Sequence, residues 1–121
     1  MAPSPLSLSA FTRIERGDAT ARVRDALSDS GAAIQDARFF SNVALSLTFE
    51  LPAEAISVLH AALVATGVRL AEESVAVLAE AALAASTLPR EGRSGDVTGT
   101  LMLTFLHDEP DLEREVPAVP G

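Results

Sequence analysis

Few residues in this 121-residue chain can do chemistry, and the first group of them lies at one turn. The segment from Glu15 to Thr20 holds a glycine and an aspartate just before an apolar helical pattern begins. Free N–H groups at a helix N-terminus attract carboxylates, so this turn is a candidate site for the anionic group of a ligand. A capped helix is the simpler alternative, because Asp18 can accept those N–H groups itself. The candidate ligand-binding residues are Arg16, Gly17, Asp18 and Ala19.

A second group of side chains lies near the C-terminus. His107 and Glu109 fall on one side of an extended chain, a spacing that can chelate zinc or manganese, and Asp111 adds a carboxylate. The alternative is a strand that runs out into solvated acids before Pro110. The other histidine, His60, is better explained as a partly buried neutral imidazole than as a metal ligand. We therefore expect no metal site. If the chain does bind a metal, the candidate ligands are His107, Glu109 and Asp111.

Composition argues against several functional classes. The absence of cysteine removes disulfides, thiolate catalysis and thiolate metal sites. Acidic residues number 17 against 9 basic ones, for a formal net charge of −8, without the basic cluster that a nucleic-acid groove needs. No apolar run reaches the roughly 18 residues of a membrane span. Neither a nucleophile elbow nor a glycine-rich phosphate loop is present, so we expect a protein that is not an enzyme and uses no cofactor.

The chain length predicts a single domain over residues 1–121, with a core at 6–111 and an extended C-terminal tail at 112–121. The prolines of the tail favour an extended form that lies across this domain or a second subunit, and a frayed end is the alternative. Residues 1–5 lack the basic start and apolar stretch of a signal peptide, so we expect a cytoplasmic location.

The candidate turn must be positioned by a strand before it and a helix after it. Residues 6–15 alternate as a strand does, and Gly17 breaks the alternation. We expect Asp18 to be the N-cap of the helix, which an apolar stripe continues as far as Gly31.

The next segment predicts a β-hairpin with strands at 32–40 and 43–51. An odd-numbered turn sets Ala37 and Phe39 beside the apolar side of the second strand. It also gathers Asp36 and Arg38 on the outer face, with Ser46 and Thr48. We prefer this register, because a slip of one residue would place charges in the core.

The rest of the chain alternates helices with strands. A helix whose first residue is Pro52 ends at Gly67, and residues 68–70 are left open as a very short strand. A third helix is expected over 72–87, where alanines leave room for a close neighbour, followed by a flexible surface loop at 89–96. The strand at 97–107 is apolar on both sides, which favours a central place in the sheet.

This order of elements predicts an α+β domain, a ferredoxin-like βαββαβ antiparallel sheet with helices on one face and an extra helix inserted before the last strand. Within it, residues 10–70 resemble an ACT domain, a small regulatory module. The resemblance rests on Gly17-Asp18-Ala19, on the stripe Val23, Ala26 and Leu27, on Ser30-Gly31-Ala32-Ala33-Ile34, and on Phe49-Glu50-Leu51-Pro52.

The resemblance implies a non-catalytic regulatory domain that binds a small molecule, such as an amino acid, at the first turn and acts as a homodimer or larger homo-oligomer. The chain departs from the family pattern at Arg16-Gly17-Asp18, where a Pro-Gly pair is usual, and at the insertion of residues 71–96. The alternative is a protein-interaction or scaffolding domain without a small ligand, which would use the alanine-rich helix and the tail as contact surfaces.

Overall fold

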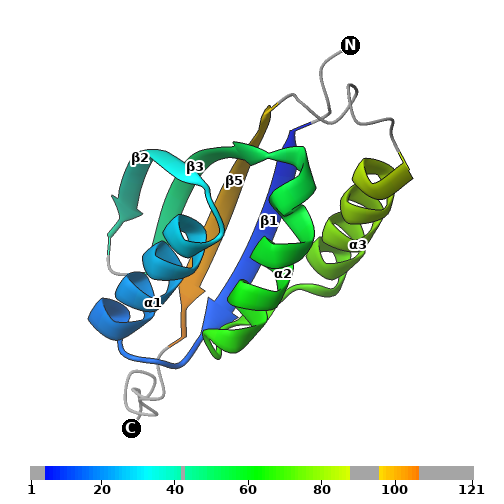
Figure 1. Ribbon diagram of the computed structural model, residues 1–121. Helices are drawn as coiled ribbons and strands as arrows, with labels where there is room; N and C mark the ends of the chain where they lie inside the picture. Colours follow the sequence, from blue (N-terminus) through cyan, green and yellow to red (C-terminus); the bar gives the residue numbers. More distant parts are fainter. Residues whose placement is uncertain (1–4, 42, 88–95, 107–121) are drawn as a thin grey trace, which may run out of the picture.

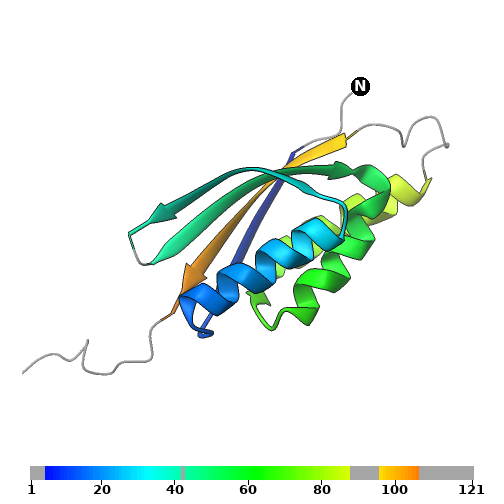
Figure 2. The ribbon, with the colours of Figure 1, turned by 60° about the vertical axis from the view of Figure 1, so that its left-hand side comes forward.

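A computed structural model describes residues 5–41, 43–87 and 96–106 of the chain. This part is an α+β arrangement in which three α-helices lie on one side of a five-stranded mixed sheet (Figures 1 and 2). The elements in chain order are β1 (Leu6–Thr12), α1 (Arg16–Asp29), β2 (Ala33–Phe40), β3 (Ala44–Pro52), the 3-10 helix η1 (Ala53–Ala55), α2 (Ile56–Ala65), β4 (Arg69–Leu70), α3 (Glu72–Thr87) and β5 (Asp96–Phe105).

The strand order, β2-β3-β5-β1-β4, differs from the expected ferredoxin-like arrangement. The last long strand, β5, lies between β3 and β1, antiparallel to β3 and parallel to β1. The expectation of an antiparallel sheet is therefore wrong for the β1–β5 pair. The short segment left open in the sequence contributes β4, which pairs antiparallel with β1 through Ala10 and Leu70.

The central place of β5 follows from its pattern of side chains. Leu101 and Leu103 are fully buried on the helix side, while Met102 and Thr104 are half-buried on the opposite face. The side chains of a central strand are less exposed to solvent than those of an edge strand, because neighbouring strands flank them on both sides. A segment with apolar side chains on both faces is therefore more stable in the centre of the sheet. The prediction of a central strand is confirmed.

The predicted hairpin register is also confirmed. Ala37 pairs with Leu47 and Phe39 with Leu45, across a three-residue turn that Ser41 enters with a positive φ of 59°. Asp36 and Arg38 lie on the outer face, opposite Thr48 and Ser46. The strand β2 is nevertheless exposed along nearly its whole length, because it forms the edge of the sheet.

Two helix starts differ from expectation. The N-cap of α1 is Glu15 rather than Asp18, so the helix begins three residues earlier than predicted from the aspartate. The Glu15 carboxylate accepts the backbone N–H of Asp18, whereas an N-cap at Asp18 would have accepted that of Thr20 or Ala21. Pro52 ends β3 and precedes η1, so it is not the first residue of α2. The helix ends agree with prediction, since Gly31 and Gly67 both have positive φ angles.

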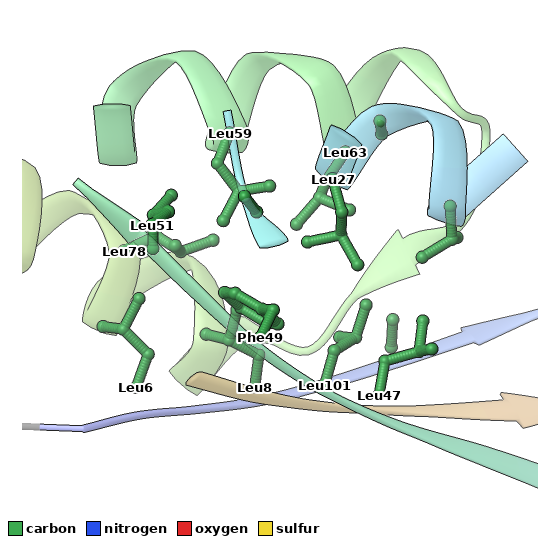
Figure 3. Packing of buried hydrophobic residues seen from close by; sticks show 14 of the residues in the cluster. Leu6, Leu8, Leu27, Leu47, Phe49, Leu51, Leu59, Leu63, Leu78 and Leu101 are labelled. Carbon is green, nitrogen blue, oxygen red and sulfur yellow. The ribbon is translucent and has the colours of Figure 1, made fainter. Parts of the chain in front are cut away.

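The core fills the space between the helix side of the sheet and the three helices (Figure 3). Phe49 of β3 is fully buried there, and its ring covers Gly99 of β5. A Cβ atom built at Gly99 would lie 2.5 Å from the Cζ atom of Phe49, so only glycine fits under this ring. Leu8, Leu27, Leu47, Leu51, Leu59, Leu63, Leu78 and Leu101 surround it as the main bulk of the core.

Several expectations concern residues outside the described ranges. These residues are 89–95 of the expected surface loop, the metal candidates His107, Glu109 and Asp111, and the tail at 112–121. Among the helices that the structure describes, none has the length and apolar character needed to cross a membrane.

Candidate functional site

A shallow hollow of ≈ 580 Å³ lies between the first half of α1 and the end of β2. It is open to solvent and includes the turn that the sequence singled out. Its walls come from two parts of the chain, the first half of α1 and Phe39 of β2, that are brought together only by the fold. The lining residues are Glu15, Arg16, Gly17, Thr20, Ala21, Arg24, Asp25 and Phe39.

Glu15 fixes the start of α1 at one end of the hollow. Its Oε1 atom accepts the backbone N–H of Asp18 at 3.0 Å, and its side chain caps the helix. Hydrogen bonds from the backbone N–H groups of Gly17 and Asp18 hold the pKa of the Glu15 carboxyl below its usual value. Glu15 therefore stays ionised at neutral pH and places a negative charge at the helix N-terminus.

The two faces of α1 separate the core from the hollow. Ala19, Val23 and Leu27 are fully buried against the sheet and the neighbouring helix. Thr20 and Arg24, one turn apart, lie on the other side of the helix and line the hollow. The apolar stripe that anchors the helix thus fixes where its polar face points.

Phe39 closes the hollow from the sheet side. It is the next-to-last residue of β2, on the same face as Leu45, and it stays 49% exposed on this edge strand. The Arg16 guanidinium lies over its ring, with 5.2 Å between the Cζ atom and the ring centroid. At this distance a cation is attracted to the face of the ring, so the pair ties α1 to β2.

The charges around the hollow are of both signs, and two of the four charged side chains, those of Glu15 and Arg16, already interact with other groups of the protein. Among the described residues, the side chains of Arg24 and Asp25 form no hydrogen bond or ion pair, whereas Arg16 lies over the Phe39 ring and its charge also acts on the Glu15 carboxylate. The Thr20 Oγ1 atom is buried and, within the described ranges, also lacks a hydrogen-bond partner. The hollow thus holds one guanidinium, one carboxylate and one hydroxyl group, those of Arg24, Asp25 and Thr20, that have no partner in the described part of the chain.

The structure places the four predicted ligand-binding residues in different surroundings. Arg16 and Gly17 line the hollow. Asp18 is exposed at the first turn of α1, outside the lining, and Ala19 is fully buried in the core. Only the first two can therefore contact a molecule in the hollow without a change in the helix.

Sequence reasoning did not single out four of the lining residues, namely Ala21, Arg24, Asp25 and Phe39. Helical spacing was a usable signal, because residues four apart share one face: Arg24 follows Thr20 at this spacing, and Asp25 follows Ala21. No comparable signal marked Phe39, whose place depends on how far β2 extends past α1.

The described residues contain no group of three or more histidine, cysteine, aspartate or glutamate side chains that could hold a metal ion. The C-terminal candidates His107, Glu109 and Asp111 lie beyond the part of the chain that the structure describes. His60 is half-buried on α2.

Comparisons of the chain with protein-family models, with curated proteins and with solved structures found no match.

Proposed function

We propose that the protein is a non-catalytic regulatory domain that binds a small zwitterionic molecule, such as an amino acid, in the hollow between α1 and β2, and that it acts as a homo-oligomer. The observation that carries the proposal is the set of charged side chains of both signs around one hollow, Arg16 and Arg24 with Glu15 and Asp25. Of these, Arg24 and Asp25 have no partner among the described residues.

The chemistry of these groups suits a zwitterion better than a simple anion or cation. A guanidinium group binds a carboxylate through two parallel hydrogen bonds, which gives both strength and orientation. The carboxylates of Glu15 and Asp25 attract an ammonium group at the same site. The exposed half of the Phe39 ring offers an apolar surface for a ligand side chain.

The strand order supports a variant of the ferredoxin-like arrangement. With β5 left out, the remaining strands follow the order β2-β3-β1-β4. The directions of the paired strands make β1 and β2 run the same way, with β3 between them, as in a split βαβ unit. The ACT-like interpretation of residues 10–70 would then describe this unit, with α3 and β5 as additions.

A thermal-shift screen with the individual amino acids tests the proposal. A ligand at about 100 times its dissociation constant adds roughly 2.7 kcal/mol to the free energy of unfolding, which raises the Tm of a domain of this size by several degrees. We expect a selective rise with one or a few amino acids, and loss of that rise in Arg24→Ala.

The matched control is Arg69→Ala, which removes an exposed arginine from β4 and leaves the hollow intact. This variant should respond to the ligand as the wild-type protein does. A response that persists unchanged in both Arg16→Ala and Arg24→Ala would show that the ligand binds elsewhere. No response to any zwitterion in the screen would contradict the proposed ligand class.

The outer face of α2 favours a second candidate function, a protein-interaction domain. The ten residues of α2 include no Asp, Glu, Lys or Arg, and Val58 and Val64 are 54% and 60% exposed. A photo-crosslinking residue at position 58 should then capture one reproducible partner in cells. The control is the same residue at Glu54, which is exposed on η1. Equal capture at both positions would contradict this candidate.

A further inference from the structure

We propose that the free edge of β2 pairs antiparallel with β2 of a second copy of this chain, about a two-fold axis at Ala37. The proposal gives a surface and a register to the homo-oligomer part of the proposed function, and it does not depend on a ligand. Its evidence is the exposed edge of β2, the order of charges along the strand and the apolar rings beside them.

The edge of β2 is open in the described part of the chain. The strand order ends at β2, and β3 occupies its other side. Phe39 and Phe40 at the end of the strand are 49% and 48% exposed, and Val43 in the turn is 49% exposed. An unpaired edge beside exposed apolar groups is a template for another strand unless something covers it.

The backbone of β2 presents its hydrogen-bonding groups in the right phase. The Val43 N–H donates to the Phe40 carbonyl at 3.2 Å, so the Phe40 carbonyl points toward β3. Because backbone groups alternate in direction along a strand, those of Ala37 and Phe39 point toward the free edge. Two copies related by a two-fold axis at Ala37 can therefore exchange N–H and C=O groups at this residue.

The charges of β2 select this register over its neighbours. Within one copy the Arg38 Nε atom donates to the Asp36 Oδ2 atom at 3.1 Å, and both side chains stay exposed. With Ala37 opposite itself, Asp36 also lies opposite Arg38 of the second copy, and Arg38 lies opposite Asp36 of that copy. A shift that keeps the same faces together would place Asp36 opposite Asp36, or Arg38 opposite Arg38. Opposite charges across a pair of strands stabilise it and like charges destabilise it, so the strand is complementary to itself in one register.

The side chains on the helix face fit the same axis. Ala37 is small, and it meets its own copy at the axis, where two large side chains would crowd each other. Phe39 of each copy lies diagonally across from Ala37 of the other, within reach of an aromatic ring. Pairing would thus cover part of the Phe39 surface that a single copy leaves exposed.

Sedimentation equilibrium at a series of protein concentrations measures the dimer directly. We expect a wild-type dimer, and a dissociation constant raised about tenfold or more in Arg38→Asp and in Asp36→Arg, because each variant sets like charges opposite each other twice. The double variant Asp36→Arg with Arg38→Asp exchanges the charges and keeps the strand self-complementary, so its dimer should return to near wild-type strength. Mixing the two single variants should give a heterodimer.

The control Arg69→Asp makes the same change of charge on β4, far along the sheet from β2, and should leave the dimer intact. A monomeric wild-type protein would overturn the proposal, and so would a dimer that is insensitive to both charge variants. A monomer that dimerises once residues 107–121 are removed would show that the chain's own tail covers the edge, which also overturns it. Ligand binding by a monomeric wild-type protein would overturn the homo-oligomer part of the proposed function and leave its ligand-binding part standing, so the two failures can be told apart.

Discussion

At the scale of single residues, Glu15 joins the fold to the candidate site. The same carboxylate caps α1 and supplies one of the negative charges around the hollow. The cap is sensitive to pH, because the hydrogen bonds from the N–H groups of Gly17 and Asp18 favour the ionised carboxylate over the protonated acid. Gly17 is close to this carboxylate: a Cβ atom there would lie 3.2 Å from Glu15 Oε1.

Replacing Glu15 with glutamine should reduce the pH dependence of stability on the acid side. The pKa of Glu15 is lowered by folding, so its contribution is present above the unfolded pKa and is lost as the pH falls through the folded value. The Tm difference between the wild type and Glu15→Gln should therefore be largest near pH 7 and shrink below about pH 4. Thermal melts of both proteins from pH 7 to pH 3 measure this difference. A difference that stays constant over the series would contradict the role of the ionised cap.

Thr20→Val should stabilise the protein without ligand by about 1 kcal/mol. The substitution keeps the shape of the side chain and removes a hydroxyl whose buried oxygen has no partner among the described residues. Urea unfolding of the two proteins measures the change, and Thr20→Ser serves as the control because it keeps the hydroxyl. A destabilised valine variant would mean that the hydroxyl does have a partner in solution.

At the scale of elements, the contact between β3 and β5 decides how closely the centre of the sheet packs. Phe49 and Gly99 are directly paired across these strands, and the ring takes the space that a side chain on β5 would occupy. A further tie connects α3 to the sheet, since the Ser9 N–H of β1 donates to the Oγ atom of Ser74 at 2.7 Å. These contacts hold β5 and β1 under the helices.

Gly99→Ala should lower the free energy of unfolding by about 1–3 kcal/mol, because the added methyl group overlaps a fully buried ring. Chemical denaturation gives this value. Thr100→Ala, on the opposite face of the same strand, is the control and should cost less. In Phe49→Leu the cost of adding Gly99→Ala should be smaller, since the ring is gone. Equal costs in both backgrounds would contradict the account of this contact.

The elements themselves were largely predictable from the sequence. The strict alternation of Val43 to Leu51 and the charges Asp36 and Arg38 settled the hairpin register, because only one register kept those charges out of the core. The position of β5 between β3 and β1 was not predictable in the same way. Apolar character on both faces shows that a strand is central, but it does not say which strands flank it.

At the scale of the whole molecule, the hollow exists because the fold brings the end of β2 over the start of α1. The helical pattern could indicate the polar face of α1, which carries Thr20 and Arg24. The contribution of Phe39 could not be read from periodicity, since it depends on the length of β2 relative to the helix layer. The strand β2 is also the exposed edge of the sheet, so the candidate ligand site and the proposed dimer surface adjoin each other at Phe39.

The most direct test of the central claim is a titration of the isotope-labelled protein with amino acids, followed in two-dimensional amide spectra. Binding in the hollow should shift the amide signals of Gly17, Thr20, Arg24 and Phe39 in a saturable way, while those of Arg69 and Val75 stay in place, because the latter lie outside the lining. Saturable shifts confined to other elements, or no shifts with any zwitterion at millimolar concentration, would contradict the account.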